Sequence, residues 1–183
     1  MGMMRRVAGQ IRSEKQKLVV RRVNVESLAV ALRERVEATV PRLLGMPESE
    51  AAHKPSPDRW SKKEILGHLI DSACNNQQRF VRAQLEGGLS FPGYEQEGWV
   101  RCQGYATADW RLLIELWAAY NKHLAEVVAR LPVAALSASC QIGGGKPVTL
   151  ASLAEDYLRH LDHHLTQLAR PVAQDAESGS RSD

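Results

Sequence analysis

LASLAEDYLRHLDHHLTQL, residues 150–168, contains neither Gly nor Pro and repeats leucine at intervals of three to five residues. Because successive residues of a helix advance by about 100°, most of these leucines fall on one face, opposite Glu155 and Asp162. The pattern predicts an amphipathic helix that begins after Thr149 and ends before Pro171. So continuous an apolar face must be buried, and we expect other helices to pack against it.

His160 and His164 lie at the border between the two faces of this helix. Being four residues apart, they stack one turn above the other, which is the spacing by which one helix offers two imidazoles to one metal ion. Leu161 stands where an HEXXH motif has glutamate, so that motif is excluded and a third ligand must come from elsewhere. The alternative is a pair of half-exposed histidines at the core boundary.

Three more segments have helical spacing of apolar residues: Val25–Leu44, Ser61–Glu86 and Thr107–Leu131. In the last of these we expect Leu112 and Leu116 on the buried face. Four long helices predict an all-α four-helix bundle.

The helix ends carry specific signals. Ser61 followed by Glu64 is a capping box, and Gly87 ends the same helix. Thr107 is expected to be the N-cap of the third helix, with Asp109 in its first turn.

Two connections between the helices differ in character. Leu89–Tyr105, LSFPGYEQEGWVRCQGY, is long and aromatic, and it either covers a site or closes one end of the bundle. Pro132–Val148 is expected to be a flexible turn or a short hairpin. Its GGGK segment is not a phosphate loop, because Cys140 and Pro147 occupy positions where that motif needs Gly and Ser or Thr.

The second helix carries one polar stripe. Asp71, Asn75 and Arg79 lie within about 60° of His68 on a helical wheel, and apolar residues occupy most of the remaining circumference. The stripe faces either solvent or a cleft, and the wheel does not separate these alternatives.

Composition limits the class of protein. The chain has 183 residues, 44% hydrophobic and 25% charged, which suits one soluble globular domain, expected over residues 23–170. We expect no membrane span, because no apolar run approaches the roughly 20 residues that one requires. The N-terminus has no secretory signal pattern, and the three cysteines form no CXXC motif. We therefore expect reduced thiols and a cytoplasmic protein.

Charge is unevenly distributed. Residues 1–22 form a basic extension with seven Arg or Lys residues against Glu14, a net charge of +6, so the remainder carries −3 of the whole-chain +3. A slightly acidic body argues against nucleic-acid binding. The polar segment at residues 171–183 is expected to be a disordered tail.

Three quoted segments together resemble the DinB/YfiT superfamily. They are PDRWSKKEILGHLIDSACNNQQRF, LSFPGYEQEGWV and VTLASLAEDYLRHLDHHLTQL, which occur in that order and at suitable separations. The resemblance covers about residues 56–168. It implies an up-down-down-up bundle with a long cross-connection between the second and third helices, and it commonly implies a homodimer.

The resemblance also implies a site and a class of activity. His68, His160 and His164 would hold one divalent transition metal, with nickel and zinc favoured and iron as a third candidate. The implied activity is metal-dependent transfer of a low-molecular-weight thiol, of the bacillithiol or mycothiol type, onto an electrophile. Similar proteins are also described as metal-dependent hydrolases. A bundle that binds metal without catalysis, as a binder or dimeric scaffold, is the alternative from another class.

Further residues have roles that the sequence leaves open. Asp71 and Asn75 are candidates to support the centre, with Asp71 orienting a histidine or being solvated. Arg79 is a candidate to hold a carboxylate of a thiol substrate or to form a salt bridge. His163 either accepts a proton near the metal or lies at the surface. Tyr94, together with Trp99, is a candidate wall of the site.

Overall fold

The computed structural model describes residues 25–171. The predicted basic extension and residues 172–183 of the predicted tail lie outside the described residues.

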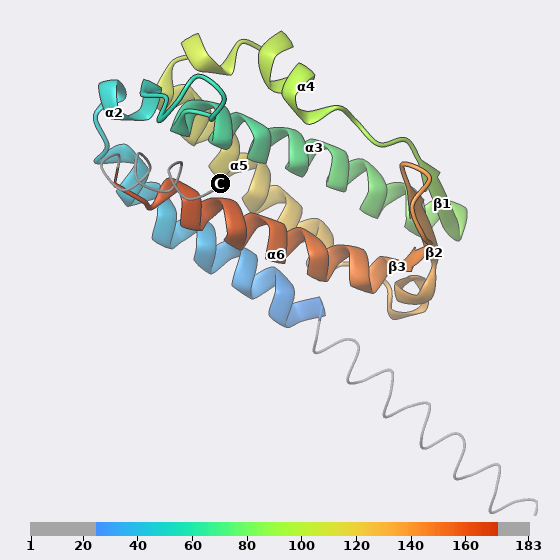
Figure 1. The fold of residues 1–183 in the computed structure, drawn as a ribbon. Helices are drawn as coiled ribbons and strands as arrows, with labels where there is room; N and C mark the ends of the chain where they lie inside the picture. The colour runs from blue at the N-terminus through green and yellow to red at the C-terminus, as the bar shows by residue number, and fades with distance from the viewer. Residues whose placement is uncertain (1–24, 172–183) are drawn as a thin grey trace, which may run out of the picture.

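Four long helices form the body of the molecule. They are residues 25–44, α3 (Lys62–Glu86), α5 (Trp110–Ala129) and α6 (Leu150–Leu168). α3 and α5 run in one direction and the other two run in the opposite direction, so the predicted up-down-down-up bundle is confirmed (Figure 1). The short α2 (Glu48–Ala52) follows the first helix. All four long helices contribute large buried side chains, among them Leu43, Phe80, Trp117 and Leu161.

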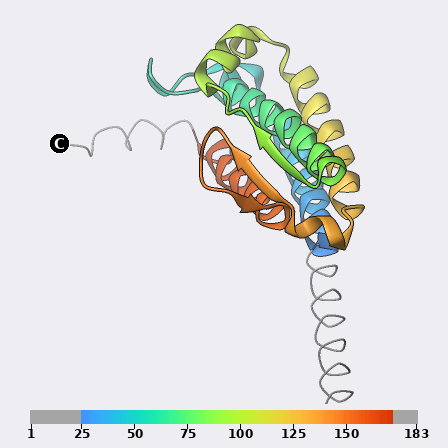
Figure 2. The ribbon, with the colours of Figure 1, turned by 90° about the vertical axis from the view of Figure 1, so that its right-hand side faces the viewer.

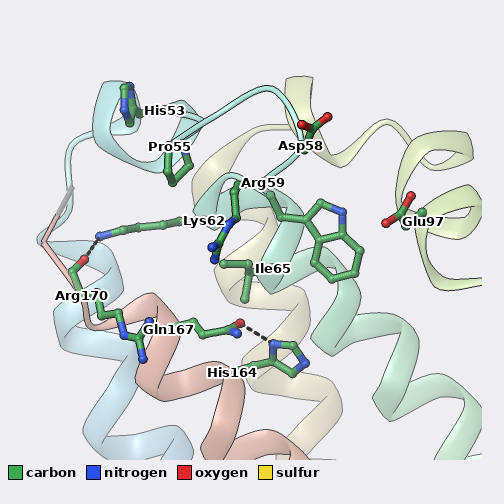
Figure 3. A pocket seen from close by; sticks show the side chains of 11 residues that line it. His53, Pro55, Asp58, Arg59, Lys62, Ile65, Glu97, His164, Gln167 and Arg170 are labelled. Carbon is green, nitrogen blue, oxygen red and sulfur yellow. Dashed lines mark hydrogen bonds between the residues drawn. The ribbon is translucent and has the colours of Figure 1, made fainter. Parts of the chain in front are cut away.

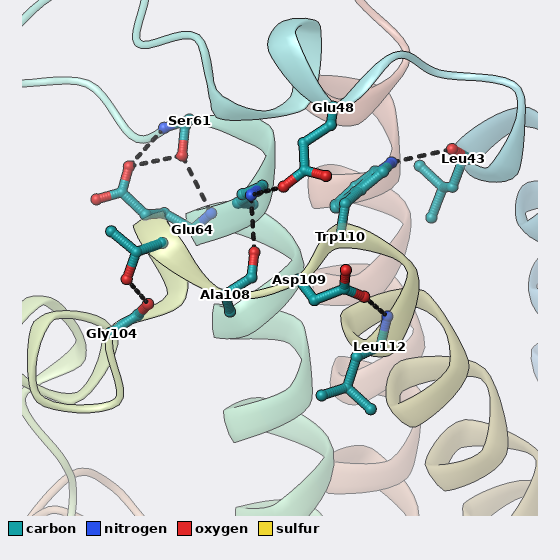
Figure 4. A network of polar contacts seen from close by, with 11 residues as sticks. Leu43, Glu48, Ser61, Glu64, Gly104, Ala108, Asp109, Trp110 and Leu112 are labelled. Carbon is teal, nitrogen blue, oxygen red and sulfur yellow. Dashed lines mark hydrogen bonds and ion pairs between the residues drawn. The ribbon is translucent and has the colours of Figure 1, made fainter.

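α3 begins at a tightly fixed point. Ser61 accepts a hydrogen bond from the backbone N–H of Glu64, and the Glu64 side chain accepts one from the Ser61 backbone, as the capping box predicts. The Lys63 ammonium, almost fully buried, donates to Glu48 at 2.6 Å and to the Ala108 carbonyl at 2.7 Å (Figure 4). One lysine thus joins the start of α3 to two segments distant in sequence, and it orients the helix in the bundle.

α5 begins later than predicted. Its N-cap is Asp109, whose side chain accepts a hydrogen bond from Leu112 N–H (Figure 4), whereas Thr107 belongs to the 3₁₀ turn η1 (Tyr105–Thr107). The predicted burial of Leu112 and Leu116 is also wrong, since they are 60% and 46% exposed. Trp110, Leu113, Ile114 and Trp117 occupy the buried face instead, and the two tryptophans bury more apolar area than leucines would.

The two long connections meet in a small sheet that the sequence did not predict as a whole. β1 (Gly88–Phe91) pairs in parallel with β2 (Ser139–Ile142), and β2 pairs antiparallel with β3 (Val148–Thr149). The β2–β3 pair is the expected short hairpin. Figure 2 views the molecule from the end that carries this sheet. β3 leads directly into α6, whose N-cap Thr149 accepts a hydrogen bond from Ser152 N–H, as expected.

Three short helical segments complete the connections. α4 (Gln96–Cys102) and η1 carry the chain back along α3 to the start of α5, and η2 (Val133–Ser137) precedes β2 (Figure 1). Within residues 25–171, no helix combines the length and the apolarity that crossing a membrane would require.

Candidate metal centre

His68 lies in the second turn of α3 and has no exposed surface. The preceding residue, Gly67, lets the Tyr105 ring pack directly against the helix, since a β-carbon at position 67 would lie 2.1 Å from that ring. The Trp60 ring lies 5.1 Å from the imidazole, centroid to centroid. Trp60 thus packs against the His68 ring, which also contacts the His160 and His164 rings of α6.

Three imidazoles converge between α3 and α6. His68 Nε2 lies 3.1 Å from His160 Nε2, and one nitrogen from each of His68, His160 and His164 falls within 4.8 Å of the others. His68 comes from α3, and His160 and His164 come from successive turns of α6. The structure therefore brings the three predicted metal ligands together.

The electrostatic environment keeps these rings neutral. Burial lowers the pKa of His68 to about 3, helped by the nearby His164 and His160. Burial also lowers the pKa of His160 to about 4, and the pKa of His164 is lowered for the same reason. Neutral imidazoles keep a free lone pair on one ring nitrogen, which is the form that binds a metal ion.

Polar neighbours orient two of the rings. His164 Nδ1 lies 2.7 Å from Gln167 Oε1, an acceptor, so this nitrogen carries the proton and Nε2 keeps its lone pair (Figure 3). Gln167 also lies 3.1 Å from His163 Nε2. Ser72 Oγ is 3.4 Å from His160 Nδ1, a long contact. Gln167 was missed by the sequence analysis, although its position three residues after His164 places it on the same face.

Two pockets reach the histidines from different sides. One, of about 310 Å³, is lined by His164, Gln167, Trp60 and Glu97 among others (Figure 3). The other, of about 250 Å³, is lined by residues that include His160, Ser72, Arg79 and Tyr94. His68 is thus buried, whereas His160 and His164 are half-buried and each borders one of the two pockets.

Asp71 forms hydrogen bonds with the cross-connection between α3 and α5. It is 2% exposed, and its Oδ1 accepts hydrogen bonds from Tyr105 at 2.8 Å and Gln103 at 2.6 Å. Burial raises the pKa of this carboxyl, although both hydrogen bonds oppose the shift. Asn75 donates to the Asp71 backbone carbonyl. Asp71 therefore fixes the segment that covers α3, whereas the hydrogen bond of Asn75 stays within that helix.

The remaining candidates lie at different distances from the centre. Tyr94 lines the His160 pocket, and Trp99 contacts Tyr94 with ring centroids 4.8 Å apart. Arg79 lines the same pocket from α3. His163 is exposed, with its ring 5.0 Å from that of His164.

The model of the DinB superfamily matches residues 31–168 of the chain. Among solved structures, the chain is similar to YfiT from Bacillus subtilis, described as a probable metal-dependent hydrolase with an unusual four-helix bundle topology. The two sequences are 17% identical, and the TM-score is 0.59 over 92% of this chain and 90% of that one. At this identity the similarity is one of fold. A search of curated proteins gave no match.

Proposed function

The chain belongs to the DinB superfamily, and on that premise we propose that it is a metal-dependent transferase that moves a low-molecular-weight thiol onto an electrophile. The observation that carries the proposal is the convergence of three neutral imidazoles from His68, His160 and His164 beside two pockets. One pocket would admit the thiol and the other the electrophile.

The donor set fits a divalent transition metal. Two ligand nitrogens on a tetrahedral zinc ion lie about 3.3 Å apart, given zinc–nitrogen bonds of about 2.0–2.1 Å. The 3.1 Å between His68 Nε2 and His160 Nε2 is close to this value, and when no ion is bound the same distance suits an N–H···N hydrogen bond between the two rings. Nickel and zinc are the ions that we propose, because both suit imidazole ligands.

The protein residues have definable tasks. When bound, the metal would supply a Lewis acid that lowers the pKa of a thiol. Gln167 holds His164 in the tautomer that presents Nε2. In the transfer, the thiol proton leaves to solvent, the sulfur forms a bond to the electrophilic carbon, and the leaving group departs with the electrons of the broken bond.

Hydrolysis is the second candidate, favoured by the same donor set, because such a centre also activates water. Hydrolysis usually needs a nearby carboxylate to take up a proton. Asp71 accepts hydrogen bonds from Tyr105 and Gln103 at Oδ1 and lines neither pocket that borders the histidines. Asp156, in the His160 pocket, pairs with Arg159 and is 60% exposed. Asp58 and Glu97 line the His164 pocket, so hydrolysis has candidate proton acceptors there, and an assay with esters tests it.

Metal analysis of untagged protein tests the centre. We expect about one equivalent of zinc or nickel in the parent and none in His160→Ala. His123→Ala is the matched control, because His123 is exposed on α5, and it should keep the metal. A parent that stays metal-free after incubation with both ions would contradict the centre. If the parent does bind metal, the loaded protein is assayed with thiol–electrophile pairs and with esters. Metal uptake without turnover would favour the non-enzymatic binder.

We further propose a cytoplasmic homodimer. Leu44, Leu112 and Leu116 are 48%, 60% and 46% exposed and supply apolar surface on the first helix and α5 that a second copy would cover. Cys74, Cys102 and Cys140 are free thiols, as a reducing compartment would keep them. Sedimentation of the parent beside Leu112→Lys tests the dimer, and a monomeric parent would contradict it.

A further inference from the structure

Arg79 is a buried cation near the far end of α3. It is 9% exposed, and among residues 25–171 its Nε has no hydrogen-bond partner and its guanidinium forms no salt bridge. Its Nη1 reaches Asn76 Oδ1 at 3.4 Å, near the limit for a hydrogen bond. Buried charges in proteins are normally paired, so Arg79 has unused capacity to bind an anion.

This guanidinium borders the same pocket as His160. Ser72, which contacts His160, lies seven residues before Arg79, about 10 Å along the helix axis. The arginine side chain leans back toward the start of α3, as its contact with Asn76 shows. A pocket of about 250 Å³ therefore has the histidine at one end and the arginine toward the other.

The surroundings of Arg79 suit a planar anion. Its guanidinium lies over the Phe91 ring at 5.6 Å, so one face is covered while the N–H edges remain available. Tyr94 also lines the pocket, and burial raises its pKa to about 12, so its hydroxyl stays a neutral donor. Asp156 lies in the same pocket but pairs with Arg159 and is largely solvated.

We propose that this pocket binds the carboxylate of a small substrate, held in bidentate fashion by Arg79, with the reacting end of the same molecule directed toward His160. The position of the reacting end rests on the proposed function, whereas carboxylate binding does not. The volume lies below the roughly 300–1,000 Å³ of common ligand pockets, so the substrate is smaller than a typical drug. Arginine matches carboxylate geometry better than lysine, since its donors are arranged in a rigid fork.

The first test uses metal-free protein, so it does not depend on the metal centre. The probes are 3-mercaptopropionate and 3-mercaptopropionamide, which differ in charge at one end. The Arg79 Nε–H resonance, identified by its loss in Arg79→Gln, should shift with the carboxylate and not with the amide. Equal shifts with both probes, no shift with either, or tighter binding of inorganic phosphate would overturn the proposal.

The second test compares variants of metal-loaded protein by calorimetry. Arg79→Gln should weaken binding of 3-mercaptopropionate roughly tenfold or more and leave the amide unaffected. Arg82→Gln is the matched control, because Arg82 also lies over Phe91, at 5.5 Å, but is exposed and paired with Glu86. Equal losses in both variants would count against the proposal. If Arg79→Gln does not fold, the acid–amide comparison in the parent decides.

Discussion

Gly67 is the position where a single added methyl group tests the packing around the centre. A β-carbon there would lie 2.1 Å from Tyr105 Cδ2 and 2.2 Å from Cγ, distances that no side chain tolerates. Tyr105 is 5% exposed and donates a hydrogen bond to Asp71, so its ring has little room to move. Gly67→Ala must therefore displace either this ring or the helix that carries His68.

The expected magnitude follows from opposing effects. Alanine favours the helix by about 1 kcal/mol over glycine. Against this, overpacking typically costs about 1–3 kcal/mol, and losing a hydrogen bond to a charged group costs about 1.5–3 kcal/mol more. Together these effects predict that Gly67→Ala lowers the free energy of unfolding by about 1.5–5 kcal/mol, whereas the same change in an exposed helix would raise it.

Urea denaturation of metal-free protein, followed by circular dichroism, measures this effect. Tyr105→Ala provides the second background, because it removes the ring that the methyl group would strike. There, Gly67→Ala should be neutral or stabilising by up to about 1 kcal/mol, a reversal of sign. A stabilising effect of Gly67→Ala in the parent, or an equal cost in both backgrounds, would refute the steric argument.

Two further predictions concern the polar surroundings of the histidines. Gln167→Ala should weaken zinc binding about 10–100-fold in a chelator competition, because the His164 Nδ1 proton loses its acceptor. His163→Ala, the control, should change zinc affinity little. Equal losses of affinity in the two variants would contradict the role of Gln167. Asp71→Asn removes a carboxyl whose pKa burial raises above its ordinary value of 3.8. The folded parent holds its proton to higher pH than the unfolded chain does, so its stability falls as the pH rises through that range. Relative to Asp71→Asn, the parent should therefore become less stable as the pH rises from below 3.8 toward neutrality in urea titrations, and a constant difference would count against the raised pKa.

Local signals predicted α6 well because its determinants lie within its own sequence. Leucine spacing, the Thr149 cap and the histidine pair all act within one helix, and the helix spans Leu150–Leu168 as expected. The start of α5 was harder, since Thr107 and Asp109 are both good caps. The Thr107 hydroxyl donates to Gly104 O, which leaves Asp109 to cap the helix.

Long-range contacts account for what the sequence did not indicate. The parallel pairing of β1 with β2 joins segments some fifty residues apart, Gly88 with Ser139. The burial of Lys63 likewise depends on partners supplied by other segments. In the centre, spacing identified the pair on α6, but His68 was assigned through the family resemblance, because a helical wheel shows neither which neighbour a face meets nor how deeply it is buried. The metal itself stays a prediction.

Because β3 leads directly into α6, inserted residues have different consequences in the hairpin and in the helix that follows it. His160 lies ten residues after Leu150, about 15 Å along the axis, so one residue inserted between them would rotate both imidazoles by about 100° away from His68. Between Gly144 and Gly145, at the exposed hairpin tip, added residues would extend into open space beside Gly144. A fluorescent or affinity label inserted at that tip would mark the protein without moving His160 and His164 relative to His68.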